Sequence, residues 1–188
     1  MATSNLEAPA ATTRQVISLP IDDGLTCLRG LSPQRLRFEL EYALERGSTA
    51  NSFLFNAGTD GEGQHQSALL VHPPGKAYDK AFLTALAGLL PSQTTALRVV
   101  VGHVNPNRVA LLRDLAGLYP ELELIASNAG AKLLGELWSQ RKPAAPGQES
   151  EQPAIPVLPA IQVIRQEQTL SLSHRHQLQL VPAPTPRW

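Results

Sequence analysis

The middle of the chain alternates between two kinds of apolar pattern, and this alternation constrains the fold more than any other feature of the sequence. Residues 78–90, 107–118 and 129–138 place apolar side chains at helical spacing, and a proline follows each of the first two segments. Residues 97–101 and 122–126 are short apolar runs of the kind found in buried strands. Strands that alternate with helices in this way predict βαβ units, with helices packed on a parallel sheet.

The first two predicted helices each have one apolar face, which we expect to be buried. The residues of these faces are Ala81, Phe82, Ala85, Leu86 and Leu89 in the first helix, and Val109, Leu111, Leu112, Leu115 and Leu118 in the second. An apolar helix face needs a sheet or another helix to cover it, so the pattern also predicts a layered domain.

The residues before these helices predict antiparallel strands. Residues 14–20 form a predicted edge strand that ends at its proline, and residues 25–28 form its partner across a turn at residues 22–24. Residues 52–55 and 67–72 predict the next pair of strands.

Two further segments precede the first helix. Residues 35–46 alternate apolar and charged side chains over seven positions, which favours a strand, although part of the same segment also fits a helix. Residues 56–63 are polar and rich in glycine, so they predict the loop of a hairpin.

Strand patterns return near the C-terminus. Residues 161–164, 169–173 and 177–181 predict three strands, of which the last two form a hairpin around residues 173–177. Before them, residues 141–160 are rich in proline, alanine and glutamine, which predicts a flexible or polyproline-like loop and not a packed element.

These patterns divide the chain of 188 residues into four parts. Residues 1–13 are small and polar, and we expect them to be disordered. Residues 14–140 form the main domain, residues 141–160 the proline-rich loop, and residues 161–188 carry strands that continue the same domain.

Composition excludes several functions. Lys+Arg and Asp+Glu number 16 each, so we expect no nucleic acid as a partner. No apolar run approaches the roughly 20 residues of a spanning helix, so we expect no membrane insertion. The single cysteine, Cys27, lies in an apolar stretch and predicts a buried thiol in a reducing compartment. These features together predict a cytoplasmic protein.

A loop with candidate ligands follows the predicted strand at residues 97–101. It contains His103 and leads into the helix that starts near Asn107. Loops at the carboxyl ends of parallel strands are where folds of this kind build functional sites. A purely structural interpretation is also open, in which Asn105 or Asn107 caps the helix and His103 is a hydrogen-bonded core histidine.

The same loop, His103-Val-Asn-Pro-Asn-Arg108, resembles the His-x-Glu-x-Asp-His metal loop of the flavodiiron proteins, and the chain is most similar to the diflavin flavoproteins of cyanobacteria. Four other stretches carry the resemblance, which runs in order over about residues 14–188 outside the proline-rich loop. They are residues 38–42, 47–54, 127–132 and 182–188.

The resemblance implies an α+β fold of the metallo-β-lactamase type. This fold is an αββα sandwich, of which the chain would form the N-terminal half, with a mixed sheet and about three helices. The family also has a flavodoxin-like domain with FMN and a di-iron centre, and it uses electrons from a reduced nicotinamide to reduce oxygen to water or nitric oxide to nitrous oxide. We expect neither cofactor in this chain, because no flavodoxin segment is present and the ligand pattern is altered.

The altered positions lie in the metal loop itself. His103 keeps the first ligand position, whereas Asn105, Asn107 and Arg108 stand where the family has Glu, Asp and a second His. Asn offers only a neutral carbonyl and Arg offers no lone pair, while iron prefers imidazole and carboxylate donors. The family's next His falls at residues 139–143, where this chain has none. We therefore expect Arg108 to fill the metal space and to pair with a carboxylate or a bound anion.

The other histidines form no ligand pattern. His174 and His176 would share a face of a strand, yet a solvated hairpin tip explains them as well, and His65 and His72 have no partner at ligand spacing.

Three functions stay open on the sequence. The first is an N-terminal piece of a diflavin oxygen reductase that is inactive by itself. The second is a degenerate binding or scaffold subunit that pairs with a full-length homologue. The third, and least supported, is an independent metallo-hydrolase.

Overall fold

The computed structural model describes residues 14–32, 48–56, 68–92, 94, 96–140, 154–172 and 176–183. Its strands are β1 (Gln15–Asp22), β2 (Leu25–Ser32), β3 (Ser48–Phe55), β4 (Ala68–Val71), β5 (Ala96–Val100), β6 (Glu121–Ser127), β7 (Ala160–Ile164), β8 (Gln168–Ser171) and β9 (Gln177–Leu180). Its helices are the short 3₁₀ helix η1 (Lys76–Tyr78), α1 (Asp79–Leu89), α2 (Pro106–Leu118) and α3 (Asn128–Trp138). Our predictions for residues 1–13, 35–46, 57–63 and 141–153 and for His65 and His174 lie outside the described residues.

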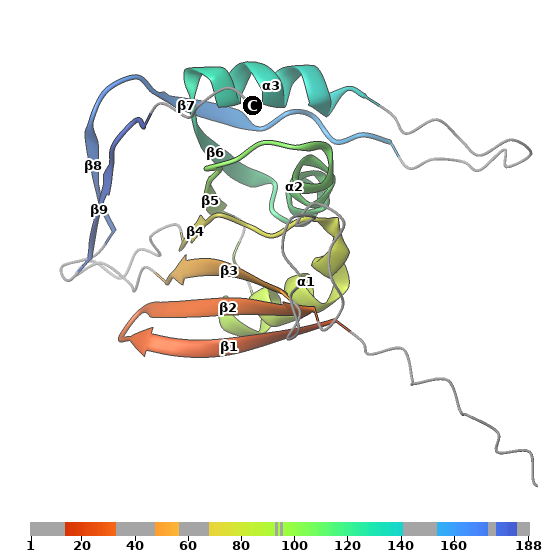
Figure 1. Ribbon diagram of the computed structural model, residues 1–188, viewed down its shortest axis with the longest axis vertical. Helices are drawn as coiled ribbons and strands as arrows, with labels where there is room; N and C mark the ends of the chain where they lie inside the picture. The colour runs from red at the N-terminus through yellow and green to blue at the C-terminus, as the bar shows by residue number, and fades with distance from the viewer. Residues whose placement is uncertain are drawn as a thin grey trace, which may run out of the picture.

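The first seven strands form one mixed sheet, and they lie side by side in the order in which they occur in the chain (Figure 1). Strands β1 to β4 are antiparallel to their neighbours, and β4 to β7 are parallel. Helix α1 connects β4 to β5, and α2 connects β5 to β6. The prediction of βαβ units on a mixed sheet with three helices is therefore confirmed.

Strand β1 is the edge strand that the sequence predicts, but it does not end at Pro20. It continues to Asp22, with a shift of register against β2 between Pro20 and Asp22. An edge strand tolerates proline because its missing N–H can face away from the partner strand. The turn at residues 22–24 is confirmed, and Gly24 has the positive φ of 80° that favours glycine there.

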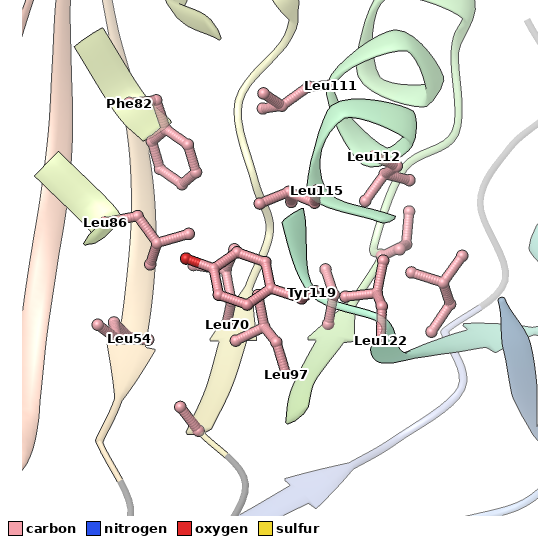
Figure 2. Packing of buried hydrophobic residues seen from close by; sticks show 14 of the residues in the cluster. Leu54, Leu70, Phe82, Leu86, Leu97, Leu111, Leu112, Leu115, Tyr119 and Leu122 are labelled. Atoms are coloured by element: carbon pink, nitrogen blue, oxygen red, sulfur yellow. The ribbon is translucent and has the colours of Figure 1, made fainter. Parts of the chain in front are cut away.

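The main core lies between the sheet and the three helices. Leu54, Leu70 and Leu97 from the strands pack against Phe82 and Leu86 of α1 and against α2 (Figure 2). Trp138 and Leu134 extend the same cluster to α3. The three helices therefore cover one face of the sheet.

The inward face of α2 matches the prediction at four positions and fails at the fifth. Val109, Leu111, Leu112 and Leu115 are all buried, whereas Leu118 is 58% exposed. Leu118 is the last residue of the helix, where the sheet no longer covers it. The prediction that Leu118 points inward is wrong, because helical spacing alone does not say where the covering layer ends.

The other face of the sheet is partly covered by the hairpin of β8 and β9. Leu170 and Leu172 of this hairpin segment pack against Leu69, Ile125 and Ile164 of the sheet. Neighbouring residues of a strand point to opposite faces, so this second cluster uses the positions that alternate with those of the main core. The predicted C-terminal hairpin is thus confirmed, and it forms the start of a second layer.

The proline-rich segment is packed at its end, contrary to the prediction of an unpacked loop. Ile155 and Leu158 are partly buried against the main core, and the indole Nε1 of Trp138 donates a hydrogen bond to the carbonyl oxygen of Pro156 at 2.8 Å. Prolines exclude regular structure but not apolar contacts, so composition misled the prediction for residues 154–159.

Arg113 of α2 fixes the end of α3. Its Nη2 donates to the carbonyl oxygens of Leu137, Trp138 and Gln140, and its guanidinium carbon lies 6.0 Å from the centre of the Trp138 ring. Carbonyl groups at a helix end have no partner within the helix, so a cation here satisfies them and favours the local dipole.

Among the described residues, no helix is both long and apolar enough to cross a membrane.

Candidate functional site

The candidate site lies at the carboxyl edge of the parallel strands, where β4 and β5 end. Strand β4 ends at Val71 and is followed by His72 and Pro73, and β5 is followed by the loop that carries His103. The backbone N–H of His72 donates to the carbonyl oxygen of Val100 at 2.9 Å, so the parallel pairing continues one residue beyond β4. The two loops are therefore held side by side.

Asn105 has the structural role that the sequence left open. It is the N-cap of α2, and its side-chain oxygen accepts a hydrogen bond from the backbone N–H of Arg108 at 2.8 Å. Pro106 follows as the first helical residue, where its lack of an N–H costs nothing. The capping interpretation of Asn105 is confirmed, and Asn107 is exposed in the first turn.

Arg108 is the most highly connected side chain of the site. Its Nε donates to the carbonyl oxygen of Pro73 at 2.7 Å, and its Nη1 donates to the carbonyl oxygen of His103 at 2.7 Å. Its Nη2 lies 3.2 Å from Nε2 of His72. In the described part of the chain, the partners of Arg108 are two carbonyl oxygens and an imidazole, and no ion pair with a carboxylate is found there. Pairing with a bound anion stays a prediction.

His72 belongs to this site, and the sequence analysis missed it. Its φ is +57°, in the left-handed region that non-glycine residues rarely adopt. The buried hydroxyl of Ser52 donates to the carbonyl oxygen of His72 at 2.8 Å and helps to hold this conformation. One signal could have found it: His72 ends a predicted strand beside residues 97–101, and parallel neighbours end at the same edge of a sheet.

The environment of His72 lowers its pKa below the usual value of about 6.5. Burial is the main cause, because it removes water from the charged form, and the positive charge of Arg108 and then His103 add to it. The folded protein therefore favours the neutral form of this imidazole more than the unfolded chain does.

This shift predicts a loss of stability in mild acid. Between the lowered pKa and about 6.5 the unfolded chain binds more protons than the folded chain, so the free energy of unfolding decreases as the pH falls through this window. Urea unfolding of the wild type at pH 7.5 and pH 5.5 should show this decrease. The variant His72→Asn, in which Asn tolerates a positive φ, should show a smaller one. The control His103→Asn removes only the smallest of the three causes, so its decrease should stay close to that of the wild type. An equal pH effect in His72→Asn would contradict the assignment.

The donors at this edge do not suit a di-iron centre. Among the residues that the structure describes, no group of three or more His, Cys, Asp or Glu side chains lies together. His103 is exposed and contributes its carbonyl oxygen to Arg108, and Nε2 of His72 already faces the guanidinium. Iron prefers carboxylates and free imidazole nitrogens, which the described residues at this edge do not supply together.

The remaining candidates lie away from this edge. Ser139 and Gln140, near the position of the family's next His, follow the C-terminal end of α3. They lie at the opposite end of this helix from Ser127, which ends β6 and caps the start of α3. The imidazole of His176 packs edge-on against Phe55 with ring centres 5.8 Å apart, and it lies 3.6 Å from a carboxylate oxygen of Asp22. The hairpin pattern suggested that His176 belongs to a solvated tip. The structure instead packs its ring against Phe55.

Cys27 is buried, as predicted. Its Sγ lies 3.9 Å from the side-chain oxygen of Asn51, which also accepts a hydrogen bond from Nε of Arg29 at 3.0 Å. The thiol is therefore part of the packing of the sheet.

Comparison with known proteins gives a consistent picture. Diflavin flavoprotein A 6 of Nostoc sp. (strain PCC 7120) is 39% identical over 176 residues, which cover 93% of this chain and 26% of that protein. Diflavin flavoprotein A 4 of the same organism is 36% identical over 96% of this chain and 27% of its own length. No protein-family model matches. The chain thus spans about a quarter of the length of these relatives.

Solved structures agree with the sequence comparison. The metal-soaked flavodiiron core of Flv1 from Synechocystis sp. PCC6803 superimposes with a TM-score of 0.75 at 32% identity, over 94% of this chain and 38% of that one. A fragment, residues 1–254, of diflavin flavoprotein A 5 from Nostoc sp. PCC 7120 gives 0.72 at 31% identity, over 93% and 60%. A flavoprotein of Thermotoga maritima shares the fold at 18% identity and a TM-score of 0.61. The predicted fold class is confirmed.

Proposed function

Because this chain is a relative of the cyanobacterial diflavin flavoproteins, we propose that it forms part of an oxidoreductase of the flavodiiron type whose own metal-loop edge holds no di-iron centre. In such a protein, electrons would pass from a reduced nicotinamide to flavin, and FMN would bind outside this segment. The segment by itself would be inactive in iron-dependent oxygen reduction. The compartment we propose is the cytoplasm, which suits the free thiol of Cys27.

The observation that carries this proposal is the position of the Arg108 side chain and its contacts with both loops. A permanently charged guanidinium occupies the space between the loops after β4 and β5 and engages both of them. A cation in that position repels a second cation, and the capping role of Asn105 removes one further oxygen from the site. The chemistry of the donors, and not the fold, sets this chain apart from an iron-binding relative.

A second candidate function is that of a non-catalytic subunit which pairs with a full-length homologue. The observation that favours it is the packing at this edge, where hydrogen bonds donated by Arg108 connect the two loops without metal ligands. An independent metallo-hydrolase is disfavoured, since the described residues bring no ligand cluster together.

Iron content provides the test. Protein carrying this segment should be reconstituted anaerobically with Fe²⁺, desalted and analysed by mass spectrometry for metals, with the Nostoc diflavin flavoprotein A 6 treated in parallel. We expect far less than one iron bound within this segment, because the loop lacks carboxylates. Two tightly bound irons per chain of this segment would overturn the proposal. A second experiment distinguishes the two candidate functions. Co-purification with an intact homologue, but not with an unrelated control protein, would support the subunit role over that of an inactive piece.

A further inference from the structure

Three electron-pair donors converge at the carboxyl edge of the sheet, and they come from two loops that are distant in sequence. They are the carbonyl oxygen of Pro73 and Nε2 of His72, which follow β4, and the carbonyl oxygen of His103, which follows β5. Converging oxygen and imidazole donors would attract a cation. In this chain that cation is the guanidinium of Arg108, which reaches all three from the first turn of α2.

A guanidinium is suited to such a position because it is planar and presents five N–H donors in a fixed arrangement. Each of its three nitrogens can serve a different acceptor at the same time, which an ammonium group on a flexible stem cannot do with equal geometry. The distances of 2.7 Å to the two carbonyl oxygens are those of strong, charge-assisted hydrogen bonds.

We propose that Arg108 is a cationic cross-link that stands in for a metal ion at this edge, joining the loops after β4 and β5 and positioning His72 as a neutral imidazole protonated at Nδ1. The assignment of the proton follows from the donors. Arg has no acceptor, so Nε2 of His72 must accept, and the proton of the neutral ring is then on Nδ1.

The backbone around His72 supports a built site and not a chance contact. A left-handed backbone at a non-glycine residue costs free energy, and it persists only when its surroundings fix it. Ser52, Val100 and Arg108 each bond to His72. Gly102 completes the arrangement, because a Cβ at that position would lie 3.3 Å from Nδ1 of His72, closer than ordinary contact.

The statement that Arg108 stands in for a metal ion rests on the proposed function. The cross-link itself can be tested without iron. The first experiment is a ¹H–¹⁵N long-range correlation spectrum of the wild type at pH 7. We expect the ¹⁵N shifts of His72 to be those of a ring protonated at Nδ1 alone. A ring protonated at Nε2, or at both nitrogens, would overturn the proposal whether or not the protein binds iron.

The second experiment compares two arginines of α2 that each donate to backbone carbonyl groups. Arg108→Ala should lower the Tm by about 5 °C or more and should shift the ¹⁵N signals of His72 toward a mixture of tautomers. The matched control Arg113→Ala should also lower the Tm, because it loses three carbonyl partners, but it should leave the His72 signals unchanged. Unchanged His72 signals in Arg108→Ala would contradict the positioning role.

A third variant tests the geometry of the cross-link. Arg108→Lys keeps the positive charge but not the planar set of donors, so its Tm should stay well below that of the wild type. A Tm equal to that of the wild type would show that charge alone suffices and would overturn the cross-link. Should Arg108→Ala fail to fold, the spectrum of the wild type still decides the position of the proton.

Discussion

Replacing Leu115 by alanine should lower the free energy of unfolding by about 3 kcal/mol. Leu115 is fully buried, and it points from α2 toward the side chains of α1 and of the central strands (Figure 2). Truncation removes apolar contacts and leaves a cavity that close-packed neighbours fill only in part. Urea unfolding followed by circular dichroism would measure the change.

Leu118→Ala is the matched control on the same helix. Its side chain is 58% exposed, so the same substitution should change the free energy of unfolding by no more than about 0.5 kcal/mol. Equal losses in the two variants would mean that α2 presents a different face to the sheet from the one described.

Adding a single methyl group at Gly30 should also be costly, with a loss of about 1–3 kcal/mol in the free energy of unfolding. Gly30 lies in β2, and a Cβ there would lie 2.9 Å from Cε1 and 3.0 Å from Cδ1 of the Tyr78 ring. Tyr78 is only 3% exposed, so the ring cannot move aside into solvent. A thermal melt of Gly30→Ala beside the wild type would show the loss as a lower Tm.

Gly88→Ala should have the opposite sign. Gly88 lies in α1, is exposed, and a Cβ there would meet nothing within 4 Å. Alanine is favoured over glycine by at most about 0.5–1 kcal/mol in a helix interior, and Gly88 lies in the last turn of α1, so this variant should be slightly more stable than the wild type. A stabilised Gly30→Ala would show that the Tyr78 ring does not lie against β2.

The periodic parts of the fold could be predicted, because their signal is local. The apolar spacing of residues 107–118 and the short run at residues 97–101 each occur within a few turns or strand positions, and both elements are present in the structure. The predictions that failed concern features that depend on the neighbouring elements of the fold. The exposure of Leu118 and the packing of residues 154–159 are set by where the covering layer ends, which no single segment encodes.

The candidate site was predicted only in part, because some of its contacts are local in sequence and others are made by the fold. The loop with His103 and Arg108 could be found from its position after a strand and from its family pattern. His72 was missed, because its contact with Arg108 spans 36 residues and its positive φ leaves no pattern in the sequence, so only its place at the end of a predicted strand pointed to it. The partners of Arg108 were also hidden, since backbone carbonyl groups are present at every residue and only the fold selects which ones converge.

The order of the strands has a consequence for how the chain is made on the ribosome. Each strand from β2 to β7 pairs with the strand synthesised before it, so the sheet can grow by one neighbour at a time as the chain emerges. The hairpin of β8 and β9 is the exception, because it folds back over strands made much earlier. Until it is synthesised, Leu69 and Ile125 lack this cover, so nascent chains that end before Leu170 should be the ones that chaperones bind.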